Sequence, residues 1–239
     1  MILVIAFIIS LIPSFAIYFC FKRIKKEEEY KASCKQAMIK GLLCVFPVIA
    51  LSAIFALIKN LLFKDVNPII YSAIHTFIVL ALAEELAKYF AGRKVINAAM
   101  PNVSWLDMIV FMGIVGIGFG LAEDIPYAIG ASVPVMLVRG IAVGHGVYGM
   151  LCGYFLGKGF KEGKDIGLGA IIVSLILHGL YDFSLEDSFL ALHESTAFLP
   201  VTLALIELIL LIVMLVFVFK QRKNEKYTAS LFPETPQDI

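Results

Sequence analysis

The sequence has few charged residues and no cysteine or histidine pattern of a soluble metalloenzyme. Charged residues make up 16% of the 239 residues, whereas hydrophobic residues make up 60%. Soluble domains use about 45–50% apolar residues, so this composition excludes a disordered chain and argues against a soluble domain. The four cysteines have neither paired nor metal-ligand spacing, so we expect free thiols. The net charge of +1 gives no indication of a nucleic-acid partner.

The chain does contain a series of long apolar runs. Each has the roughly 20 residues that a helix needs to cross a bilayer. We predict an all-α fold, a polytopic transmembrane helix bundle of about seven spanning helices, without an internal repeat. The first run has no basic segment before it and no small-residue cleavage site after it, which indicates an uncleaved spanning helix. The predicted spans are 2–21, 41–63, 69 to beyond 90, 107–129, 134–157, 166–183 and 197–219.

The distribution of lysine and arginine predicts an orientation in the cell membrane. The segment after the first span carries seven basic residues, from Lys22 to Lys40, and the segments after the third, fifth and seventh spans are also basic. The alternate loops contain only Lys64. Because basic loops stay in the cytoplasm, we predict an external N-terminus and a cytoplasmic C-terminus. The membrane domain then covers 1–219, with a short cytoplasmic tail at 220–239.

The third predicted span contains two adjacent carboxylates, Glu84 and Glu85, followed by Lys88. An ionised carboxylate in hydrocarbon costs at least roughly 2.5–3.5 kcal/mol, so a purely structural helix has no reason to carry two. Glu84 and Lys88 have the favourable order for a helical ion pair. Neutralisation of Glu84, or snorkelling towards the cytoplasm, would account for Lys88 but would leave Glu85 unexplained.

Other predicted spans also carry polar residues where lipid would penalise them. His178 and Asp182 are one helical turn apart, so Asp182 is placed to orient the imidazole. Glu123 follows a series of glycines that let helices approach closely. Glu207 has no polar neighbour at helical spacing, and we assign it no role. The full set is Glu123, Arg139, His145, His178, Asp182 and Glu207.

The depths of these residues are compatible with one shared cavity. At about 1.5 Å per residue, His145 and His178 both lie roughly 18–20 Å from the cytoplasmic ends of their spans. Glu84 and Glu85 match that depth only if the third helix continues to about Ala98. His75 is nine residues from Glu84 and faces roughly the opposite side, so we interpret it as an interfacial or bundle residue.

Two imidazoles together with carboxylates are suitable ligands for zinc. A catalytic zinc site uses about three protein ligands and leaves one position for water. A nearby glutamate then acts as general base. Neither serine nor cysteine stands beside a histidine at a spacing suited to nucleophilic catalysis, and the H-E-x-x-H signature is absent. Proton- or cation-coupled transporters also use intramembrane acids and histidines, so these residues alone leave both classes open.

Four short motifs occur in order on successive predicted spans. They are Glu84-Glu85-x-x-Lys88, Phe119-x-x-x-Glu123, Arg139 followed by His145, and His178-x-x-x-Asp182. This set resembles the motifs of PrsW-type intramembrane metalloproteases, a branch of the group containing CAAX prenyl endopeptidases and bacteriocin-processing proteins. The resemblance covers roughly residues 70–185. It implies a membrane enzyme that cleaves membrane-anchored regulatory proteins, in the type example an anti-sigma factor.

The resemblance also implies roles for individual residues. Glu84 and Glu85 would activate water, and His145 and His178 would bind a divalent metal, with zinc the expected ion. Glu123 stands where the wider group usually has histidine. We predict Glu123 as a third ligand, with water orientation or simple packing as its alternatives. The predicted supporting residues are Lys88, Arg139 and Asp182.

The leading hypothesis is therefore a metal-dependent intramembrane endopeptidase acting on a membrane-anchored protein. The alternative is a proton- or cation-coupled transporter, which would show flux that depends on the proton gradient and no bound metal. A third possibility is an inactive relative that binds a partner without cleaving it. The sequence indicates neither the substrate nor the oligomeric state.

Overall fold

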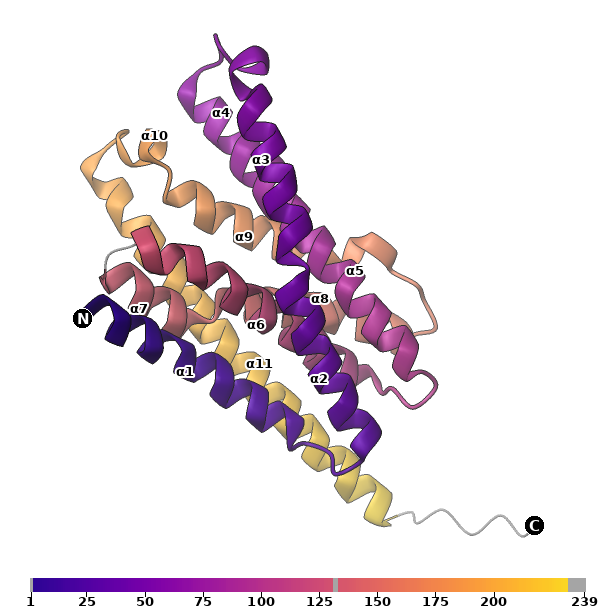
Figure 1. Ribbon diagram of the computed structural model, residues 1–239. Coiled ribbons are helices and arrows are strands. Elements are labelled where there is room, and N and C mark those ends of the chain that lie inside the picture. Colours follow the sequence, from indigo (N-terminus) through magenta and orange to yellow (C-terminus); the bar gives the residue numbers. More distant parts are fainter. Residues whose placement is uncertain (1, 131–132, 232–239) are drawn as a thin grey trace.

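The computed structural model describes residues 2–130 and 133–231, which are almost entirely helical and include no strand (Figure 1). Seven helical stretches in this part of the chain are long and apolar enough to cross a membrane, which confirms the predicted all-α bundle. These stretches are Val4–Lys22, Glu28–Lys59, Pro68–Ala99, Trp105–Pro126, Met136–Lys161, Gly167–Ser184 and Phe198–Asn224.

The second span begins earlier than its hydrophobicity suggests. After α1 (Ile2–Lys22), helix α2 (Glu28–Leu43) leads into α3 (Val45–Leu62), with a break only at Cys44. Charged residues lower the mean hydropathy of α2, so its hydrophobicity alone did not reveal that it continues the span. One face of α2 nevertheless has buried residues at helical spacing, and α2 packs against α6. These buried residues are Tyr30, Cys34, Ala37, Met38 and Gly41.

The third span consists of α4 (Pro68–Ile74), a π-helical segment η1 (His75–Ala81) and α5 (Leu82–Ala99). The side chain of Asn67 caps α4 by accepting a hydrogen bond from the Ile69 amide at 2.9 Å. Glu84 and Glu85 can lie as deep as His145 and His178 only if this helix continues to about Ala98. Helix α5 reaches Ala99 and so meets that requirement. The π-helical segment ends immediately before α5, and such segments occur frequently at functional sites.

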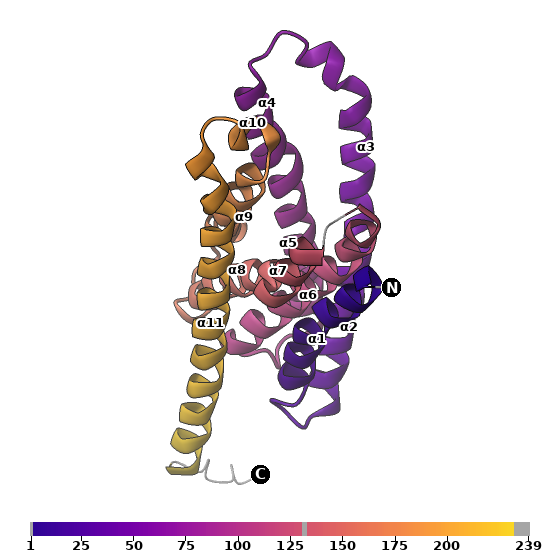
Figure 2. The ribbon, with the colours of Figure 1, turned by 90° about the vertical axis from the view of Figure 1, so that its left-hand side faces the viewer.

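Helices α6 (Trp105–Gly130) and α8 (Gly144–Lys161) form the centre of the bundle, and the other spans surround them (Figures 1 and 2). The apolar window of the α6 span is 83% buried, whereas five of the other spans are at most 33% buried. A Cβ atom added to certain glycines of α8 would overlap the backbone of α6. The absence of side chains therefore permits this close approach. These glycines are Gly149, Gly153 and Gly157.

The fifth predicted span is broken, although its apolar run is continuous. A short helix, α7 (Val133–Ala142), precedes α8, and Val143 between them has a φ of 47°. This left-handed conformation is unusual for a β-branched residue. Glycine at 140, 144 and 146 weakens helix propensity around the break. As a result, His145 lies in the first turn of α8 rather than inside a long helix.

The remaining elements complete the bundle. Helix α11 continues beyond the predicted span, so the first part of the expected tail is helical, and residues 232–239 lie outside the described residues. Figures 1 and 2 place the C-terminal end of α11 and the α1–α2 turn at one end of the molecule, opposite the α3–α4 turn. The elements are η2 (Gly167–Ile171), α9 (Ile172–Ser184), α10 (Asp187–Leu190), η3 (Glu194–Ala197) and α11 (Phe198–Leu231).

Candidate metal centre

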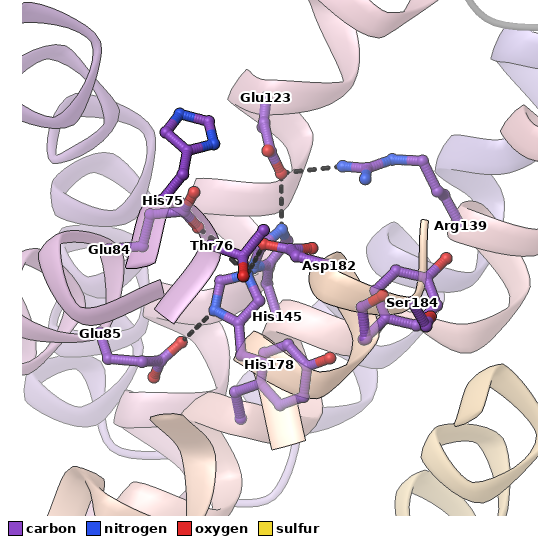
Figure 3. A network of polar contacts seen from close by, with 12 residues as sticks. His75, Thr76, Glu84, Glu85, Glu123, Arg139, His145, His178, Asp182 and Ser184 are labelled. Carbon is purple, nitrogen blue, oxygen red and sulfur yellow. Dashed lines mark hydrogen bonds and ion pairs between the residues drawn. The ribbon is translucent and has the colours of Figure 1, made fainter. Parts of the chain in front are cut away.

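Polar side chains from five helices form one connected network inside the bundle (Figure 3). Helix α5 contributes three residues, α9 two, and α6, α7 and α8 one each. The structure thus brings together all eight residues that the sequence singled out for the site. They are Glu84, Glu85, Lys88, Glu123, Arg139, His145, His178 and Asp182.

His178 is held by a carboxylate on one ring nitrogen. Its Nδ1 lies 3.0 Å from Glu85 Oε1. An ionised carboxylate only accepts hydrogen bonds, so Nδ1 donates to Glu85, and Nε2, which also faces carboxylates, must be without a proton before it can bind a metal. Nε2 lies 3.5 Å from Glu84 Oε2 and 3.2 Å from Asp182 Oδ2. A carboxylate behind a histidine is the usual arrangement for a metal-ligating imidazole.

His145 repeats this arrangement with the opposite nitrogen. Its Nε2 donates to Glu123 Oε2 at 2.6 Å, and the same carboxylate oxygen accepts a 2.8 Å hydrogen bond from Arg139 Nη2. The remaining nitrogen, Nδ1, lies 3.9 Å from Glu84 Oε2. Glu123 therefore lies behind His145, on the side away from Glu84, and Arg139 holds it there.

Glu84, His145 and His178 each offer one donor atom within 4.8 Å of the others, an arrangement able to hold a metal ion. Tetrahedral zinc has bonds of about 2.0–2.1 Å, which puts its donor atoms about 3.4 Å apart. Glu84 Oε2 and His178 Nε2 are already 3.5 Å apart. Glu84 Oε2 is also buried and accepts no hydrogen bond, and a buried polar atom in that state requires an explanation. These residues therefore fit a divalent cation.

Lys88 is buried rather than snorkelling, since its side chain is 1% exposed. Its Nζ lies 2.6 Å from Glu85 Oε1 and 3.7 Å from Glu84 Oε2. It also lies 3.1 Å from His145 Nδ1, so it competes with any bound cation for that nitrogen. The ammonium stands 4.7 Å from the centre of the Phe119 ring, a favourable cation–π contact.

Two residues beside the histidines were not among the predicted site residues. The Tyr148 ring stacks on His178, with centroids 4.8 Å apart and planes at 20°, and its hydroxyl donates to Glu207. The position of Tyr148, three residues after His145 on the same helix face, was the signal available in the sequence. A cavity of about 40 Å³, with room for water, lies beside these side chains. Its lining includes Arg139, His145, Tyr148, His178, Asp182 and Glu207.

His75 lies outside this network. Its ring stacks on Tyr71 with centroids 5.7 Å apart, and its Nδ1 is 3.8 Å from Glu186 Oε1. Its side chain is 25% exposed. These contacts agree with its interpretation as an interfacial or bundle residue.

Comparison with known proteins agrees with this geometry. A family model described as PrsW family intramembrane metalloprotease matches residues 36–220, which include all eight network residues. A protein of Oceanobacillus iheyensis named Protease PrsW is 31% identical over 120 residues, covering 47% of this chain and 55% of that protein. The match thus spans about half the length of that relative.

Two further relatives carry the same name. The protein of Geobacillus kaustophilus is 24% identical over 169 residues, which cover 66% of this chain and 71% of that protein. The protein of Clostridioides difficile is 26% identical over 178 residues, which cover 68% and 72%. No solved structure matches the chain.

Proposed function

The chain belongs to the PrsW family of intramembrane metalloproteases, and from this premise we propose that it is a metal-dependent endopeptidase that hydrolyses a peptide bond of a membrane-anchored protein. The observation that carries the proposal is the convergence of Glu84, His145 and His178 on a buried carboxylate oxygen that accepts no hydrogen bond. The family match does not favour the transporter alternative.

In this proposal Glu84, His145 and His178 hold the metal, with zinc the expected ion. When bound, the metal would lower the pKa of its water towards neutrality, and its positive charge would polarise the scissile carbonyl. Glu85 and Glu123 keep the two imidazoles in the tautomers that direct a lone pair towards Glu84. This gives Glu84 the ligand role first expected for Glu123.

The resemblance assigns water activation to Glu84 and Glu85, whereas the contacts favour Asp182 as general base. Glu85 Oε1 is occupied by both Lys88 and His178. Asp182 lines the cavity and is close to His178 Nε2, so its carboxylate is placed to accept a proton from the attacking water. Lys88 offsets the charge of Glu85, and Arg139 that of Glu123.

The resemblance also supports a finer proposal about substrate and setting. The substrate is a membrane-anchored regulatory protein of the anti-sigma-factor kind, cleaved in a stress response. The chain sits in the cell membrane with its N-terminus outside. Its membrane domain covers 1–219 and its motif core about 70–185. The family belongs to the wider group of CAAX prenyl endopeptidases and bacteriocin-processing proteins.

The test combines metal analysis with cleavage. We expect the purified chain to bind about one zinc per molecule, and Glu84→Gln and His178→Ala to lose it. In vesicles containing single-span proteins tagged at both ends, both variants and a chelator should abolish fragment release. His75→Ala is the matched control, because it removes a histidine of the same span as Glu84 that lies outside the network. Undiminished cleavage in both variants would end the proposal.

The same assay separates the two carboxylates. Asp182→Asn is expected to retain the metal and to lower kcat by about 10²–10⁴-fold, the usual contribution of a general base. Glu85→Gln is expected to weaken metal binding as well, because it disturbs the hydrogen bond to His178 Nδ1. A Glu85→Gln variant with wild-type metal affinity and a large loss of kcat would restore Glu85 as the base.

A further inference from the structure

Glu207 on α11 is a buried carboxylate for which the proposed chemistry has no use. This residue is only 4% exposed, in a span whose apolar window is only 28% buried inside the bundle. One carboxylate oxygen, Oε1, accepts the Tyr148 hydroxyl. The other lies against the start of α8, since a Cβ atom added to Gly144 would come within 2.8 Å of Oε2. An ionisable residue inside a membrane span is energetically costly, so the presence of Glu207 there points to a functional role.

Tyr148 connects Glu207 to the candidate metal centre. Its hydroxyl is held by Glu207, and its backbone carbonyl accepts a 2.8 Å hydrogen bond from Ser174 Oγ on α9. Its ring stacks on His178, 4.8 Å away with planes at 20°. Tyr148 is thus fixed between α9 and α11, with its flat face against a candidate metal ligand.

The stacked ring adds a second constraint on His178 to the hydrogen bond with Glu85. The hydrogen bond between Nδ1 and Glu85 holds one edge of the ring. The second side-chain torsion of histidine has broad minima, so hydrogen bonds at the ring edge still allow the ring to tilt within a range. A parallel ring in contact restricts that rotation, and His145 adds an edge-on contact at 5.1 Å and 85°. The plane of the ring decides where Nε2 points.

We propose that Glu207 and Tyr148 are positioning residues of this centre: Glu207 anchors the Tyr148 hydroxyl, and the Tyr148 ring holds the His178 imidazole with Nε2 facing Glu84. The inference rests on the proposed function and deepens it. It also gives a role to α11, which lies outside the region that carries the motifs. Neither residue touches the scissile bond in this scheme.

The experiment measures Co²⁺ affinity, the visible spectrum of the cobalt-loaded protein and thermal stability for purified full-length variants. We expect Glu207→Leu and Tyr148→Phe each to weaken Co²⁺ binding by about tenfold and to shift the spectrum, as for other residues that orient a ligand. The double variant should be no weaker than either single variant, because both break the same link. Glu207→Gln should retain wild-type Co²⁺ binding, since the amide oxygen of glutamine still accepts a hydrogen bond from the Tyr148 hydroxyl.

Leu211→Ala is the matched control. Leu211 is buried one turn further along α11, and its truncation should lower the Tm without changing Co²⁺ affinity. Wild-type affinity and spectrum in both Glu207→Leu and Tyr148→Phe would overturn the inference while leaving the metal centre intact. If Glu207→Leu fails to fold, the Co²⁺ affinity and spectrum of the nearly isosteric Tyr148→Phe variant test the inference instead. Failure of the wild-type chain to bind Co²⁺ would instead overturn the proposed function.

Discussion

At the scale of single residues, the adjacent glutamates face different nitrogens of His178, because neighbouring positions on a helix point about 100° apart. Glu84 Oε2 faces His178 Nε2 at 3.5 Å, whereas Glu85 Oε1 lies behind the same ring at Nδ1, 3.0 Å away. In the proposed site, this pair of residues therefore supplies both a ligand and the group that orients another ligand. Glu123 acts on His145 as Glu85 acts on His178.

Replacing Glu123 tests this division of roles. If Glu123 orients His145 without touching the metal, Glu123→Gln should weaken zinc affinity by about 10–100-fold and leave a detectable site. Competition with a chromogenic chelator gives the affinity. Asp124→Asn is the control, because Asp124 also pairs with Arg139, at 3.2 Å, and no contact with His145 is found. Complete loss of zinc in Glu123→Gln would indicate that Glu123 is a direct ligand, as the sequence suggested.

At the scale of elements, the contact between α6 and α8 decides whether the centre forms. His145 lies in the first turn of α8, against Gly116 of α6, where an added Cβ would overlap the His145 carbonyl. Glycine at this crossing lets the two backbones approach closely enough for His145 to reach Glu123. The left-handed residue Val143 sets where α8 begins, and so where His145 lies on it.

A single methyl group at this crossing should therefore disturb the centre. Gly116→Ala is expected to cost about 1–3 kcal/mol by overpacking and to weaken zinc binding through displacement of His145. Thermal unfolding in detergent and zinc competition measure the two effects. Gly169→Ala is the control, since its Cβ would meet only a methyl group of Ile166 at 3.2 Å. Wild-type zinc affinity in Gly116→Ala would show that the crossing does not position His145.

At the scale of the whole molecule, the two ends of the bundle differ in their number of basic residues, which bears on how it lies in the membrane. One end of the molecule contains the α1–α2 turn and the end of α11, and it carries many basic residues (Figures 1 and 2). In the α3–α4 turn, at the opposite end, the single basic residue is Lys64. At the basic end, buried Asp107 joins three segments by pairing with Lys25, 2.7 Å away, and with Arg222. This end is the one we expect in the cytoplasm.

Cysteine labelling tests the orientation. In a background with the four native cysteines replaced, Asp65→Cys should react with a membrane-impermeant maleimide on intact cells. Glu162→Cys should react only after permeabilisation, because its loop is expected inside. Both positions are exposed, so access to the reagent depends on the side of the membrane alone. Labelling in the reverse pattern would contradict the predicted orientation.

The membrane class, the number of spans and the set of polar residues in the network follow from the sequence alone. Hydrophobicity and charge are local properties, and an ionisable residue inside a long apolar run is recognisable as costly from the sequence itself. Glu84, Glu85, His145 and His178 were therefore recognisable without coordinates. Only the tertiary structure decided that Glu84 faces both histidines, that Glu123 stands behind His145, and that Glu207 reaches Tyr148. These relations depend on how each helix is rotated and where α8 begins, and those are set by packing between segments far apart in the sequence.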